Sequence, residues 1–130
     1  MARILLIDDM KGVRRTVCAV LKRAGHDVTE ADDGGVGLQL LQSGQTFDLV
    51  ITDMLMPKHD GTEVILYLGS IANPPKVLAI SGGGAQVSAD EAFMLARTKA
   101  DGTLAKPFDN DELIVMVDRL LDANHRAAGA

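Results

Sequence analysis

Five polar side chains of this sequence could do chemistry together: three carboxylates, one hydroxyl and one ammonium. They belong to Asp8, Asp9, Asp53, Ser81 and Lys106. Carboxylates brought close together repel one another and need a compensating cation. Oxygen ligands without a nearby His or Cys suit Mg²⁺, and a zinc site is not expected. With Lys106 as a second positive charge and Ser81 as a donor, such a group could hold a metal ion, a carboxylate nucleophile and an incoming phosphoryl group.

Each of these residues stands at or just beyond the end of a predicted strand. Apolar runs without polar alternation, at residues 4–7, 49–51 and 77–80, are typical of strands buried on both faces. Weaker strands are predicted at residues 27–31 and 102–105, because each lies between helical patterns and turn residues. Ligands of an open parallel sheet bind beyond the carboxyl ends of its strands. A single Asp or Ser there is commonly only a helix cap, so the predicted site depends on the convergence of all five residues.

Segments with helical periodicity separate the strands. The first has apolar residues on one face, namely Val13, Val17, Val20, Leu21 and Ala24. Gly25 follows as a natural C-terminal stop, and a second helix is predicted over residues 36–41. Three later helices have the spacing of a reciprocal N-terminal cap: Asp60 with Glu63, Ser88 with Glu91, and Asp109 with Glu112. Strand and helix thus alternate five times, which predicts an α/β fold with a doubly wound, three-layer parallel sheet and right-handed crossovers.

The composition fits one domain around one core. The chain has 130 residues, 47% of them hydrophobic, and we expect a domain over residues 1–124 with a short, frayed tail at residues 125–130. The net charge of −5 repels nucleic acid and anionic lipid. Cys18 is the only cysteine, and its apolar neighbours indicate a buried thiol. Because Asp8 and Asp9 interrupt the first apolar run, we expect no signal peptide, no membrane span and a cytoplasmic protein.

An ordered set of short motifs across this chain resembles the receiver domains of two-component response regulators, including the chemotaxis receivers. The motifs are Asp8-Asp9, Asp53-Met54-Leu55-Met56-Pro57, Gly61, Ser81 and Lys106-Pro107-Phe108. The resemblance implies a flavodoxin-like (βα)5 sheet with strand order 2-1-3-4-5. It also implies that Asp53 accepts a phosphoryl group, and that Lys106 and Ser81 contact that group. Mg²⁺ would be held by Asp9, Asp53 and the backbone carbonyl of Leu55, with Asp8 assisting through water.

The same resemblance implies a signalling role. A histidine kinase or a histidine phosphotransfer protein would supply the phosphoryl group, and the chain would be no enzyme beyond its own phosphorylation and slow dephosphorylation. The new charge of about −1.5 to −2 would alter the surface from the fourth strand to the fifth helix. That surface would contact a downstream protein target, with no nucleic acid or membrane as partner.

The sequence departs from the family pattern at the residue three before Lys106. Family members usually carry Tyr or Phe there, and this chain has Thr103. A threonine cannot fill the space of a ring, so we expect signalling to use the loop after Ser81 and the fourth helix. Leu55 and Gly83 occupy positions that flank the path of a hydrolytic water in the family. Neither side chain can orient water, so the phosphoryl group is expected to persist.

Three other functions compete with this interpretation. A magnesium-dependent phosphohydrolase would place its nucleophile in an Asp-x-Asp motif after the first strand, where this chain has Asp8-Asp9-Met10. A flavodoxin-like electron carrier needs a hydroxyl-rich phosphate loop there, and two aspartates would repel the flavin phosphate. A constitutive interaction module would keep the fold without phosphorylation. The sequence does not decide whether the chain acts alone or is part of a longer protein.

Overall fold

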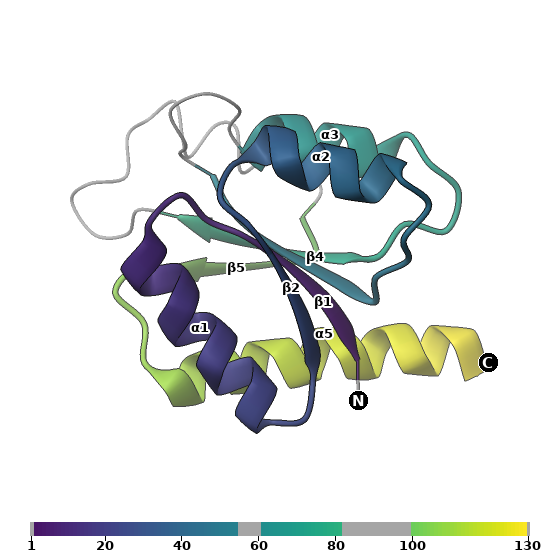
Figure 1. Ribbon diagram of the computed structural model, residues 1–130. Helices are drawn as coiled ribbons and strands as arrows, with labels where there is room; N and C mark the ends of the chain where they lie inside the picture. The colour runs from purple at the N-terminus through teal and green to yellow at the C-terminus, as the bar shows by residue number, and fades with distance from the viewer. Residues whose placement is uncertain (1, 55–60, 82–99, 130) are drawn as a thin grey trace.

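The computed structural model describes residues 2–54, 61–81 and 100–129 and shows a single parallel sheet (Figure 1). Its strands are β1 (Arg3–Ile7), β2 (Asp27–Ala31), β3 (Leu49–Asp53), β4 (Lys76–Ser81) and β5 (Gly102–Ala105). All pairings are parallel, and the order is β2-β1-β3-β4-β5. The predicted strands and the predicted strand order are therefore confirmed.

Helices cover both faces of the sheet. They are α1 (Lys11–Arg23), α2 (Gly34–Gln42), α3 (Gly61–Gly69) and α5 (Asn110–Gly129). Figure 1 shows α1 and α5 on one face and α2 and α3 on the other, which confirms the three layers. The helix predicted to begin at Ser88 lies outside the described residues.

The helix ends follow local signals in the sequence. Gly25 has φ +96°, and its N–H donates to the Lys22 carbonyl while the next N–H donates to the Leu21 carbonyl. This pair of bonds is a Schellman ending, which favours glycine because the left-handed backbone penalises a Cβ. Asp109 Oδ1 accepts from the Glu112 N–H at 2.7 Å, as the predicted cap requires. The cap predicted at Asp60 lies outside the described residues.

The last helix, α5, continues through Gly129. The alanine-rich sequence of its last turns accounts for this, because alanine has the highest intrinsic helix propensity and an established helix extends at little cost. The predicted division into a domain at residues 1–124 and a short tail at residues 125–130 stays a prediction.

The alternation of side chains along the strands divides the core into two layers. On β1, Ile4 and Leu6 pack toward α1 and α5, whereas Leu5 and Ile7 pack toward α2 and α3. All four side chains are fully buried. Each large aliphatic side chain buried in this way stabilises the fold by about 1.5–3 kcal/mol. Cys18 lies in the α1 layer at 5% exposure, which confirms the predicted buried thiol.

The strand registers decide which polar residues meet at the carboxyl edge of the sheet. Ile7 of β1 aligns with Thr52 of β3, so Asp8 comes out beside Asp53. On the other side of β3, Asp53 aligns with Ile80, so Ser81 extends one residue further. Ser81 in turn aligns with Ala105, which Lys106 follows. The predicted convergence of these strand ends is thus built into the pairing of the sheet.

Candidate functional site

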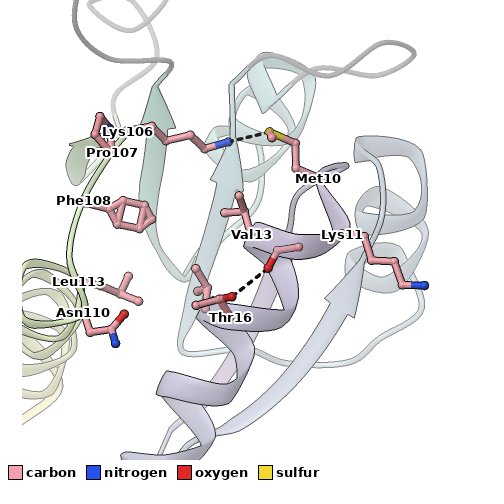
Figure 2. A pocket seen from close by; sticks show the side chains of 11 residues that line it. Met10, Lys11, Val13, Thr16, Lys106, Pro107, Phe108, Asn110 and Leu113 are labelled. Carbon is pink, nitrogen blue, oxygen red and sulfur yellow. Dashed lines mark hydrogen bonds between the residues drawn. The ribbon is translucent and has the colours of Figure 1, made fainter.

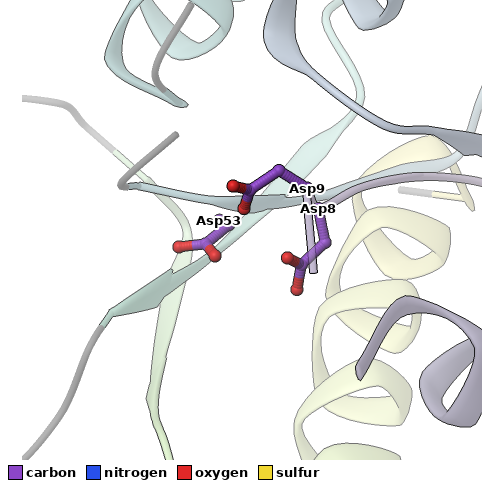
Figure 3. A group of neighbouring side chains, drawn as sticks. All are labelled: Asp8, Asp9 and Asp53. Atoms are coloured by element: carbon purple, nitrogen blue, oxygen red, sulfur yellow. The ribbon is translucent and has the colours of Figure 1, made fainter. Parts of the chain in front are cut away.

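Three carboxylates form the centre of the site. One oxygen from each of Asp8, Asp9 and Asp53 lies within 4.8 Å of the others, and Figure 3 shows them gathered where β1 and β3 end. Asp8 is 1% exposed and Asp53 4% exposed, and Asp9 is the most exposed of the three. Burial and mutual repulsion both destabilise ionised carboxylates that lie so close together.

Lys106 supplies one compensating charge. Its Nζ lies 2.9 Å from Asp53 Oδ2 and 3.7 Å from Asp8 Oδ2, and its side chain is 19% exposed. Burial alone would lower the pKa of Lys106, but the hydrogen bond and negative charge of Asp53, together with Asp8, outweigh that effect and raise it. Lys106 therefore stays an ammonium and holds the acidic residue predicted to be the nucleophile.

Burial and the negative charge of Asp53 both act on the carboxyl of Asp8. Its pKa is raised, first by burial and then by the charge of Asp53, against the lowering effect of the Met10 N–H and of Lys106. Three carboxylates and one ammonium leave two negative charges in excess among these four side chains. A divalent cation ligated by oxygen would balance that excess, so the donor set fits the predicted Mg²⁺. The Leu55 carbonyl, the fourth predicted ligand, lies outside the described residues.

Backbone and side-chain hydrogen bonds fix the loop between β1 and α1. The Met10 N–H donates to Asp8 Oδ1 at 2.9 Å, and Arg14 Nη1 donates to the Asp8 carbonyl at 2.8 Å. Arg14 also forms an ion pair with Glu30 on β2 at 3.1 Å. The sequence analysis missed Arg14, although a basic residue on the first turns of a helix that follows two aspartates was an available signal.

Ser81 and Lys106 are neighbours across the last two strands. Ser81 is 6% exposed, and its carbonyl accepts from the Lys106 N–H at 3.1 Å. The backbones of the two residues predicted to contact a phosphoryl group are therefore hydrogen-bonded neighbours at the ends of β4 and β5. The roles of Asp53, Ser81 and Lys106 remain predictions at this point.

Thr103 lies on β5 and is exposed. It aligns with Ala79 of β4, whose side chain belongs to the α2 and α3 layer, whereas the adjacent Leu104 packs toward α1 and α5. The position of the usual aromatic residue is thus on the sheet face opposite α5. Gly83, which we expected to affect dephosphorylation, lies outside the described residues.

A groove of about 660 Å³ runs from the site along α1 to the start of α5. Figure 2 shows Met10 and Lys106 facing each other at one end of it. Met10 Sδ lies 3.6 Å from Lys106 Nζ, and the Met10 side chain is 52% exposed. The sequence analysis did not connect these two residues, because their contact joins positions 96 apart in the chain. The remaining wall is mostly apolar and includes Val13, Phe108 and Leu113.

Two further observations concern membrane-spanning helices and the cysteine. In the part of the chain that the structure describes, no helix is long and apolar enough to cross a membrane. Burial raises the pKa of the Cys18 thiol, and the charge of Glu30 adds to this effect. Cys18 is therefore held as a neutral thiol.

Comparisons with known proteins agree with this geometry. Residues 4–118 match the model of the response regulator receiver domain family. The response regulator receiver protein CpdR of Brucella abortus is 32% identical over 123 residues, which cover 95% of this chain and 99% of that protein. The transcriptional regulator NtrC of Azospirillum brasilense is also 32% identical over 123 residues, 95% of this chain but 25% of that protein. The chain spans about half the length of other curated relatives it matches.

Solved structures show the same fold. A CheY-like receiver domain from Methanospirillum hungatei superposes with a TM-score of 0.87 at 23% identity, covering 98% of both chains. The chemotaxis protein CheY4 of Vibrio cholerae gives 0.79 at 29% identity, covering 92% of this chain and 98% of that one. Sequence, family model and fold agree: this chain belongs to the response regulator receiver domain family of two-component signalling proteins.

Proposed function

We propose that this receiver domain is a phosphorylation-dependent switch in which Asp53 accepts a phosphoryl group. The observation that carries the proposal is the 2.9 Å contact of Asp53 Oδ2 with Lys106 Nζ inside a buried cluster of three carboxylates. A histidine kinase or a histidine phosphotransfer protein is the donor. Asp8, Asp9, Asp53 and the Leu55 carbonyl would hold Mg²⁺, which would supply positive charge to the phosphoryl oxygens.

The residues of the chain position the reacting groups and stabilise the charge on the transferred phosphoryl group. An Asp53 carboxylate oxygen attacks phosphorus, the bond from phosphorus to the donor nitrogen breaks, and an aspartyl phosphate forms. Lys106 lies beside the nucleophile and balances charge on the transferred group. Ser81, which is buried at the end of β4, donates its hydroxyl to a phosphoryl oxygen in this proposal. The chain thereby assists its own modification and is a signalling module, with only slow loss of the phosphoryl group.

Phosphorylation changes the charge balance at the carboxyl edge of the sheet. The added charge of about −1.5 to −2 pulls on Lys106 and Ser81, which are joined by a backbone hydrogen bond between β4 and β5. The surface from β4 to α5 therefore carries the signal to a downstream protein. We place the domain at residues 1–124, and we assign it to the cytoplasm with no nucleic acid or membrane as its direct partner.

Intact mass after incubation with acetyl phosphate and Mg²⁺ tests this proposal. The wild type gains one phosphoryl group, and the Asp53→Asn protein gains none. Asp48→Asn is the matched control, because Asp48 stands before β3 at the opposite edge of the sheet and accepts from the Arg3 N–H at 2.8 Å. It keeps the adduct. An adduct that persists in Asp53→Asn, or in the presence of EDTA, would contradict the proposal, and steady release of phosphate over many turnovers would instead indicate a phosphohydrolase.

A further inference from the structure

Among the residues that the structure describes, three acceptor atoms lie near the ammonium of Lys106. Asp53 Oδ2 lies at 2.9 Å, Met10 Sδ at 3.6 Å and Asp8 Oδ2 at 3.7 Å. An ammonium has three N–H donors, so each of these atoms can take one of them. The weakest acceptor is the thioether sulfur, since sulfur accepts hydrogen bonds poorly and carries no net charge. An incoming phosphoryl oxygen therefore gains a donor most easily by displacing Met10.

Met10 is accessible and held in place. Its side chain is 52% exposed, whereas Met54 beside Asp53 is 2% exposed. Its backbone N–H donates to Asp8 Oδ1 at 2.9 Å, and its carbonyl accepts from the Arg14 N–H at 2.9 Å. The sulfur lies at the end of the groove beside Lys106, where small solutes can reach it (Figure 2). Exposure and thioether chemistry together make Met10 a target for oxidation.

We propose that Met10 is a peroxide-sensitive modification site that controls the availability of Lys106, an inference that rests on the proposed phosphorylation of Asp53. A peroxide transfers one oxygen atom to the sulfur, so the thioether is oxidised by two electrons to the sulfoxide and the peroxide is reduced to water or an alcohol. The sulfoxide oxygen is a strong acceptor in place of a weak one. It keeps an N–H of Lys106 that the phosphoryl group needs, and phosphorylation slows.

The experiment compares each protein with its own oxidised form. Wild type and Met10→Leu are treated with hydrogen peroxide, oxidation is located by peptide mass mapping, and the rate of phosphorylation by acetyl phosphate with Mg²⁺ is measured. Met10→Leu is the control because leucine cannot be oxidised and every other methionine is kept. Methionine sulfoxide reductase is then applied to the oxidised wild type, since it returns the sulfoxide to the thioether.

We expect Met10 to be oxidised at least about tenfold faster than Met54, because Met10 is exposed and Met54 is buried. Oxidised wild type is expected to phosphorylate about fivefold more slowly than the untreated protein, the effect of losing one ordinary hydrogen bond in the transition state. The reductase restores the rate, and Met10→Leu shows no change on treatment.

Two results would overturn the inference while leaving the proposed function intact. The first is an unchanged rate in wild type with Met10 fully oxidised. The second is an equal loss of rate in Met10→Leu, which would place the sensitive group elsewhere. Absence of phosphorylation in the untreated wild type would instead overturn the proposed function, and the role of Met10 with it.

Discussion

Replacing Lys106 by methionine should destabilise the metal-free protein because it removes the ammonium that pairs with the buried Asp53. At the observed 2.9 Å between Lys106 Nζ and Asp53 Oδ2, an effective dielectric constant of about 20 gives a gross attraction of about 6 kcal/mol. Desolvation of the two groups offsets a large part of this. Removing one partner of a fully buried pair costs about 3–5 kcal/mol.

The expected cost for Lys106→Met is somewhat smaller, because the Lys106 side chain is 19% exposed. We expect the free energy of unfolding to fall by about 2–4 kcal/mol. Methionine keeps most of the apolar stem, so little of this loss comes from packing. Mg²⁺ should recover part of the loss, since a cation bound among the carboxylates relieves the same repulsion.

The free energies of unfolding of wild type and Lys106→Met are measured by urea unfolding followed by far-ultraviolet circular dichroism, once in EDTA and once in Mg²⁺. Lys76→Met is the matched control, because Lys76 Nζ lies 3.8 Å from Asp101 Oδ1 and both side chains are about a third exposed. Such surface pairs contribute less than about 1 kcal/mol. If Lys106→Met cost no more than Lys76→Met in EDTA, the electrostatic account of the site would be wrong.

Three further predictions follow from the same contacts. The raised pKa of Asp8 means that its protonated form favours folding, so its stabilising contribution is lost as pH rises through that pKa. Without Mg²⁺ at neutral pH, Asp8→Asn should therefore unfold at a higher urea concentration than wild type. A lower midpoint would show that the charged Asp8 carboxylate stabilises the fold, contrary to this prediction. Burial and Glu30 raise the pKa of Cys18, so iodoacetamide should modify Cys18 far more slowly in the folded protein than in urea, and equal rates would place the thiol at the surface. Gly25→Ala should lower the free energy of unfolding by about 1–2 kcal/mol, because φ is +96° while an added Cβ meets nothing within 4 Å. Gly12→Ala in α1, where an added Cβ also has open space, should not destabilise the protein. Equal losses of unfolding free energy in the two variants would contradict the claim that the left-handed backbone at Gly25 requires glycine.

The sheet and its carboxyl edge were predictable because the sequence signals are local. Continuous apolar runs mark the strands that are buried on both faces, and a polar residue at the end of each run fixes where Asp53 and Ser81 emerge. The parallel order then makes their meeting a consequence of topology. The Gly25 stop and the Asp109 cap were readable for the same reason, since each is set by a few adjacent residues.

Contacts that depend on the bending of long side chains were not predictable. Arg14 reaches back to the Asp8 carbonyl and across to β2, and Met10 turns toward Lys106 rather than into the core. Nothing in the spacing of Met10 distinguishes it from an ordinary solvent-facing residue. For Arg14, the basic charge shortly after two aspartates was a signal of its location, but it does not specify which atoms the side chain contacts.

The most direct test of the proposed function is the location of the phosphoryl group. Wild type phosphorylated by acetyl phosphate with Mg²⁺ is cleaved and sequenced by tandem mass spectrometry under conditions that preserve acyl phosphates. We predict that the modification lies on Asp53, whose carboxylate is the one that contacts Lys106 at 2.9 Å. A phosphoryl group on Asp8 or Asp9, with Asp53 unmodified, would contradict the assignment of nucleophile and metal ligands.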